Sequence, residues 1–196
     1  MCKFSESTKQ KLGNAIVYIA QHTSNLSKTK LLKLLYLMEE RMVLKYHVPF
    51  IGIPFEVWQA GPVAKDVFVD LSDGPFLLKG FVTTEFRDGG TFIKAVTDFD
   101  DSEFSECEIT MMDDVLNKYG SMTASELVLE THKKGTLWYR IAARYGLLDA
   151  FNKHECNNSD FQINFAEAMS PCAAEDYQEC LNIRQTANLL NAESHV

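Results

Sequence analysis

Apolar residues recur every three or four positions in two segments at the beginning of the chain. Leu12, Ile16 and Ile19 share one face of a helix expected over residues 5–22. A second helix is expected over residues 28–46, where the apolar stripe is wider. Its members are Leu31, Leu32, Leu34, Leu35, Tyr36, Met38, Met42 and Val43. So wide a stripe predicts a helix that is buried on more than one side, in the centre of the fold.

The middle of the chain predicts a short helix and a β-hairpin. Pro62 suits the first turn of a helix, so we expect a third helix to start there and to reach Leu71. Residues 81–87 and 91–97 are typical of strands and flank an Asp-Gly-Gly turn at 88–90. We expect this hairpin to be the only sheet.

The second half of the chain contains clear signals of helix ends. Ser105 with Glu108 and Thr123 with Glu126 form capping-box patterns, which predict helices ending near Gly120 and His132. Further helices are expected over 136–145 and from 171 to about 190, with a polar loop over 152–160. The predicted fold class is mainly α with a small inserted antiparallel β-hairpin (α+β), in a single compact domain.

Charge and cysteine content narrow the possible functions. The 196 residues carry a formal net charge of -8, which disfavours non-specific binding to nucleic acid or to an anionic membrane. The five cysteines form no C-x-x-C pair, the N-terminus lacks the apolar core of a signal peptide, and there is no long apolar run. We therefore expect reduced thiols, a cytoplasmic location and no membrane span.

The sequence shows no familiar catalytic motif. A Walker-type phosphate loop, H-E-x-x-H and G-x-S-x-G are all absent, so we expect no enzymatic activity, no metal and no cofactor. Two alternatives stay open. A nuclease or hydrolase would require several acid–base or nucleophilic side chains to converge: Cys107, Asp113, Asp114, Glu126 and His132. A DNA-binding regulator of its own operon would require one continuous basic face: Lys133, Lys134, Arg140 and Arg144.

Three short motifs occur in a distinctive order. Lys33-x-x-Tyr36 lies in the leucine-rich segment, Trp58-x-x-Gly61-Pro62-Val63 follows about twenty residues later, and His132 is separated from Trp138 by five residues. This order resembles the Panacea domain of phage-associated, SocA-like and GepA-like antitoxins. The resemblance extends over about residues 5–145.

The resemblance implies a small bacterial antitoxin that neutralises a toxin, encoded beside it, by direct binding. It leaves open whether the partner is also delivered to a protease. It places the domain at residues 1–146, and we expect 147–196 to be a helical extension packed on the same domain. The family signature, expected to serve structure first and partner binding second, is Tyr36, Trp58, Gly61, Pro62, Val63, His132 and Trp138. We expect Trp58 to pack against the second helix near Tyr36.

Overall fold

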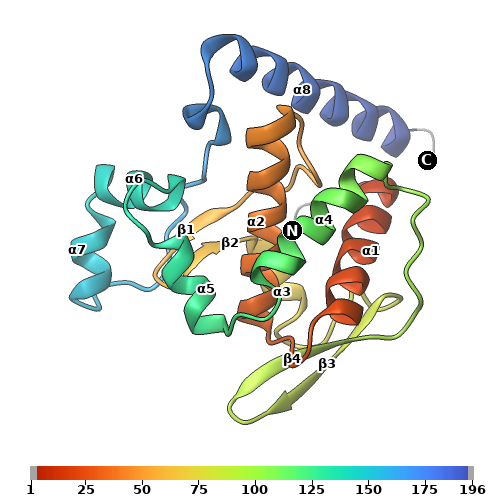
Figure 1. Cartoon of the computed structure of the whole chain (residues 1–196), viewed down its shortest axis with the longest axis horizontal. Coiled ribbons are helices and arrows are strands. Elements are labelled where there is room, and N and C mark those ends of the chain that lie inside the picture. Colours follow the sequence, from red (N-terminus) through yellow and green to blue (C-terminus); the bar gives the residue numbers. More distant parts are fainter. Residues whose placement is uncertain (1–3, 194–196) are drawn as a thin grey trace.

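Helix α2 (Lys28–Tyr46) lies at the centre of the fold, with the other elements packed around it (Figure 1). The computed structural model describes residues 4–193, which form eight α-helices, one 3₁₀-helix and two separate two-stranded antiparallel sheets. The Ser27 side chain caps α2 by accepting a hydrogen bond from the Lys30 N–H. The consecutive residues 31–34 point to different sides of the helix and are each at most 2% exposed, which confirms that α2 is enclosed on more than one side.

Most helices begin and end close to the predicted positions. They are α1 (Glu6–His22), α4 (Glu106–Tyr119), α5 (Ala124–Thr131), α6 (Leu137–Arg144) and α8 (Pro171–Glu193). Both predicted capping boxes are formed. Two short helices were not predicted: α7 (Leu147–Asn152) and the 3₁₀-helix η1 (Phe165–Ala168). Each places a buried phenylalanine, Phe151 or Phe165, in the core, so tertiary packing rather than local sequence fixes them.

The predicted hairpin is present as β3 (Val82–Arg87) and β4 (Gly90–Ala95). The expectation that it is the only sheet is wrong, because β1 (Glu56–Trp58) pairs with β2 (Gly61–Val63). Pro62 therefore lies in a strand and not in a helix, and helix α3 (Lys65–Asp70) begins only after it. A proline is tolerated there because the opposite residue, Val57, directs both backbone groups away from β2: its N–H donates to the Phe161 carbonyl, and its carbonyl accepts from the Ser159 hydroxyl, so no N–H is needed from Pro62.

The chain beyond residue 146 returns to the free side of β1. The Val57 N–H donates to the Phe161 carbonyl, and the Ile163 N–H donates to the Phe55 carbonyl. Ile163 and Tyr177 are buried in the same hydrophobic cluster as the leucines of α2. This segment thus completes the packing around β1.

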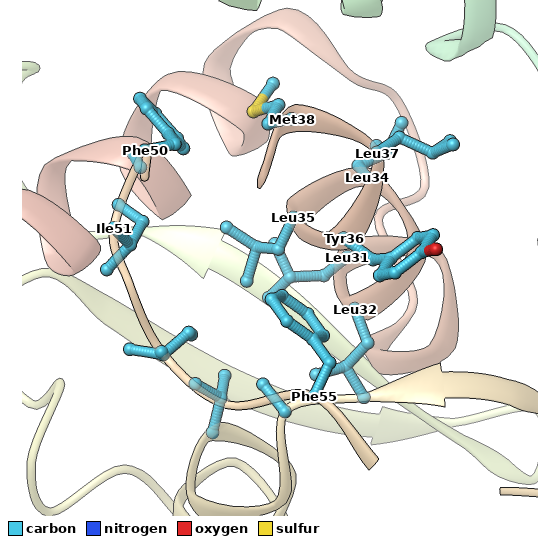
Figure 2. Close-up of a cluster of buried hydrophobic side chains, with 14 of the residues drawn as sticks. Leu31, Leu32, Leu34, Leu35, Tyr36, Leu37, Met38, Phe50, Ile51 and Phe55 are labelled. Carbon is cyan, nitrogen blue, oxygen red and sulfur yellow. The ribbon is translucent and has the colours of Figure 1, made fainter. Parts of the chain in front are cut away.

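Aromatic rings and leucines form the core beside α2 (Figure 2). Tyr36 is 1% exposed, and its ring centroid lies 5.4 Å from that of Phe55 and 5.8 Å from that of Phe165. In Figure 2 the Phe55 ring lies close to the leucine side chains of α2. None of the helices in residues 4–193 is long and apolar enough to cross a membrane.

One carboxylate lies inside this core. Glu39 of α2 is 1% exposed, and its two oxygens accept hydrogen bonds from the backbone N–H groups of Phe50, Ile51 and Gly52. Burial raises the pKa of Glu39, and the hydrogen bonds from the backbone oppose that rise. Glu39 thereby fixes the chain that leaves α2 and leads to β1.

Candidate functional site

The turn between β1 and β2 is held by three side chains from three different helical segments. Lys33 Nζ of α2 donates to the Pro62 carbonyl at 2.7 Å, and Trp138 Nε1 of α6 donates to the Trp58 carbonyl at 3.0 Å. His132 Nε2, at the end of α5, lies 2.9 Å from the Gln59 carbonyl. We call Lys33, His132 and Trp138 the turn clamp. They supply donors to backbone carbonyls on both sides of a turn whose tip, Ala60, is exposed.

Gly61 is the point at which the clamp and the turn come closest. Its φ of +96° is unfavourable for other residues. A Cβ atom at this position would lie 2.8 Å from both Lys33 Cε and Thr131 Oγ1, and 3.3 Å from His132 Cε1. Both the backbone conformation and the space therefore require glycine here.

Lys33 is an uncommon residue for the centre of an apolar helix. It is 1% exposed, and burial lowers the pKa of its ammonium group to about 7. No carboxylate is paired with it among the ion pairs of residues 4–193. Its hydrogen bond to the Pro62 carbonyl connects α2 to β2. Removing the amine from water costs free energy, which this hydrogen bond partly offsets.

His132 faces two acceptors at once. Its Nδ1 lies next to the Val128 carbonyl and its Nε2 next to the Gln59 carbonyl. A neutral imidazole donates one hydrogen bond, and an imidazolium donates two. Burial lowers the pKa of His132, the two carbonyls oppose this shift, and the charge of Lys33 adds to it.

The two tryptophans of the signature have different environments. Trp138 is 2% exposed, and its ring centroid lies 3.7 Å from that of His132. Trp58 is only half-buried, and its Nε1 donates to Glu56 at 2.9 Å. Its ring packs on Phe68 of α3, with centroids 5.0 Å apart, and not on Tyr36 as expected. Successive side chains of a strand point to opposite faces, so Trp58 and Glu56 lie on the face of β1 opposite to Phe55, which packs on Tyr36.

Most signature residues therefore meet at one place. The clamp brings Trp58, Gly61, Pro62, His132 and Trp138 together, whereas Tyr36 packs on Phe55 elsewhere along α2. Val63 is buried at the end of β2. Of the seven residues only Trp58 and His132 are partly exposed, so the other five present little surface to a partner.

Sequence reasoning missed the roles of Lys33 and Thr131 at this turn. The signal for Lys33 was a cation between Leu32 and Leu34 in an otherwise apolar stripe. No sequence pattern indicated a role for Thr131, because its position against Gly61 depends on tertiary structure.

Three of the five residues named for catalysis, Asp113, Glu126 and His132, form hydrogen bonds with different partners. Glu126 closes the capping box with Thr123, and Asp113 accepts a hydrogen bond from the Tyr18 hydroxyl. Asp114 lines a cavity of about 410 Å³ between α2 and α4, together with Glu40, whose carboxylate accepts from the Tyr36 hydroxyl. In residues 4–193 no group of three His, Cys, Asp or Glu side chains is placed to hold a metal ion.

Two of the four residues named for a basic face are paired with carboxylates. Lys133 pairs with Glu130, and Arg144 pairs with Glu167 through both of its terminal nitrogens. These pairs reduce the positive charge available for phosphates on that side of the molecule.

A family model described as "Antitoxin SocA-like, Panacea domain" matches residues 31–139, more than half of the chain. The chain belongs to the SocA-like Panacea domain family. The matched region begins in α2 and ends in α6, so it contains the whole turn clamp of this Panacea domain. Neither the comparison with curated proteins nor that with solved structures gave a match.

Proposed function

We propose that the protein is an antitoxin that neutralises a cognate toxin by direct protein–protein binding. The observation that carries this proposal is membership of the SocA-like Panacea family. The proposed action is binding alone, without chemistry on the partner. The turn clamp would then serve to hold the binding scaffold in shape.

The charge of the chain supports a basic partner. With 27 acidic and 19 Lys and Arg residues, the protein attracts a positively charged surface over several ångströms before contact. Complementary charge of this kind raises the association rate more than the final affinity. An antitoxin gains from fast association, because it must reach the toxin before the toxin reaches its target.

The test is co-expression with the product of the adjacent gene. We expect growth to stop when that gene is expressed alone and to resume when this protein is co-expressed. Purified proteins should then form a stable complex in size-exclusion chromatography. Rescue without a detectable complex would reject neutralisation by direct binding, and absence of toxicity from the adjacent gene would reject that gene product as the toxin.

A further inference from the structure

A groove between α2 and α4, which pack side by side in Figure 1, is lined by apolar side chains from both helices. We call this cavity of about 410 Å³ the α2–α4 groove. Leu37 and Val115 are buried in it, whereas Leu44 is 42% exposed and Tyr119 is partly exposed. The lining residues are at positions 37, 40, 41, 44 and 45 of α2 and 114, 115, 118 and 119 of α4. Because residues three or four apart share one side of a helix, each helix presents a single stripe to the groove.

Three cations line the same groove. They are Arg41 and Lys45 of α2 and Lys118 of α4, and all three are exposed. None of them takes part in an ion pair within residues 4–193. Arg41 and Lys45 lie four residues apart, a spacing at which like charges destabilise a helix. The cluster therefore costs the isolated domain some stability, and a partner that brings negative charge would remove this cost.

Two carboxylates reduce this positive charge but do not cancel it. Glu40 is partly buried and accepts a hydrogen bond from the Tyr36 hydroxyl at 2.6 Å. Asp114 is exposed at the groove. With three cations against two carboxylates, the groove is locally positive in a chain whose net charge is -8. Charge and apolar surface together favour an occupant that is acidic on one side and apolar on the other.

We propose that the α2–α4 groove binds an acidic amphipathic helix of the toxin. This inference rests on the proposed antitoxin function and names the surface that performs it. Apolar side chains that recur every three or four residues along such a helix contact Leu44 and Tyr119. Carboxylates beside them pair with Arg41 and Lys118. The total charges of the two proteins attract them over a distance, and the groove then fixes the orientation in which they dock.

Nucleic acid would also bring negative charge to these cations, but two observations favour a helix. The carboxylates of Glu40 and Asp114 lie in the same groove and repel phosphates. The apolar side chains of the lining offer no hydrogen bonds to a sugar–phosphate backbone.

The experiment measures the affinity of the full-length protein for the purified product of the adjacent gene by isothermal titration calorimetry. Arg41→Glu, Lys118→Glu and Leu44→Ala should each weaken binding by about tenfold or more, as loss of an interface anchor does.

The matched control is Lys79→Glu, which changes the total charge by the same amount as Lys118→Glu. Lys79 is exposed in the loop before β3, does not line the groove and forms no ion pair within residues 4–193. Because a basic toxin is attracted by added negative charge, this variant should bind within about twofold of the wild type or more tightly. Opposite effects of the same substitution at two positions would locate the acidic helix at the groove.

Melting temperatures separate binding from folding, and the titrations are run well below the lowest of them. The four substituted side chains are exposed, so the variants should melt close to the wild-type protein. Lys118→Glu places a carboxylate in the last turn of α4, where the helix dipole disfavours it. If that variant melts lower, Arg41→Glu provides the same test of charge further from a helix end.

The possible results distinguish failure of this inference from failure of the proposed function. Wild-type binding that all three groove variants retain overturns the groove and leaves the antitoxin proposal standing. Weaker binding by Leu44→Ala alone, with both charge variants unaffected, overturns the acidic character of the helix. Absence of wild-type binding overturns both proposals. Binding of a single-stranded oligonucleotide that Arg41→Glu and Lys118→Glu abolish would also overturn the inference, because the cations would then serve phosphates.

Discussion

Replacing Gly61 by alanine tests whether the turn clamp is a close-packed unit. The added Cβ meets two atoms at 2.8 Å, Lys33 Cε and Thr131 Oγ1. Neither neighbour retreats easily, since Lys33 is buried and bonded to Pro62, and Thr131 Oγ1 donates to the Val128 carbonyl. Overpacking of this kind costs about 1–3 kcal/mol. The positive φ adds about 1–2 kcal/mol, so we expect a total loss of about 2–5 kcal/mol in the free energy of unfolding.

Gly135 provides a matched control for the backbone effect. Its φ is +95°, against +96° for Gly61, but nothing lies within 4 Å of the position that its Cβ would occupy. Gly135→Ala therefore carries the conformational cost without the steric one. The difference in unfolding free energy between the two variants therefore measures the steric cost at the clamp alone. We expect this difference to be about 1–3 kcal/mol.

Urea unfolding followed by far-UV circular dichroism measures both variants under identical conditions. With a slope of about 2 kcal/mol per molar urea, the Gly61→Ala midpoint should fall about 0.5–1.5 M below that of Gly135→Ala. Equal midpoints would refute the close packing of Gly61 against Lys33 and Thr131. A Gly135→Ala variant that is the less stable of the two would refute the reasoning as a whole.

Further predictions concern the buried charges and the two tryptophans. Folding lowers the pKa of Lys33 from 10.5 to about 7, so the unfolded chain binds more protons between these values and stability rises with pH. The free energy of unfolding should therefore increase by about 2 kcal/mol from pH 7 to pH 9, and Lys33→Met should remove this increase. Urea titrations at both pH values measure it; an equal increase in the variant would contradict the prediction. Glu39→Gln places an amide N–H against backbone N–H groups and should cost about 2–3 kcal/mol by the same assay, with an unaltered midpoint counting against the role given to Glu39. Trp138→Ala should cost about 3–5 kcal/mol, and Trp58→Ala, at a half-buried position, about 1–3 kcal/mol; calorimetric melting that ranks them in the opposite order would show that Trp58 is the more important packing residue.

Helices with local signals were the most predictable part of this fold. Ser105 and Thr123 carry their capping partners three residues away, so the information lies within one turn of chain. The α2 stripe was equally clear, because residues in contact with the core recur at helical spacing. In each of these segments the local preference and the final structure agree.

The β1–β2 ribbon was not predictable by the same reasoning. Its two-residue turn, Gln59-Ala60, has no residue typical of a hairpin, and Pro62 suggested a helix. The ribbon exists because Lys33, His132 and Trp138 supply donors from other parts of the chain. The side of β1 on which Trp58 lies depends on this register, so its contact with Phe68 could not be inferred either.

Sequence separation within the clamp has a consequence during synthesis. The carbonyls of Pro62, Gln59 and Trp58 receive their donors from residues 29, 73 and 80 positions away. A nascent chain that has left the ribosome only as far as α5 has the β1–β2 segment and Lys33 but lacks the tryptophan that closes the turn. Because contacts this distant form late, the native scaffold is completed only after α6 has emerged. Incomplete translation products that stop before Trp138 therefore lack the donor to the Trp58 carbonyl, and the clamped turn depends on synthesis continuing through at least the first two thirds of the chain.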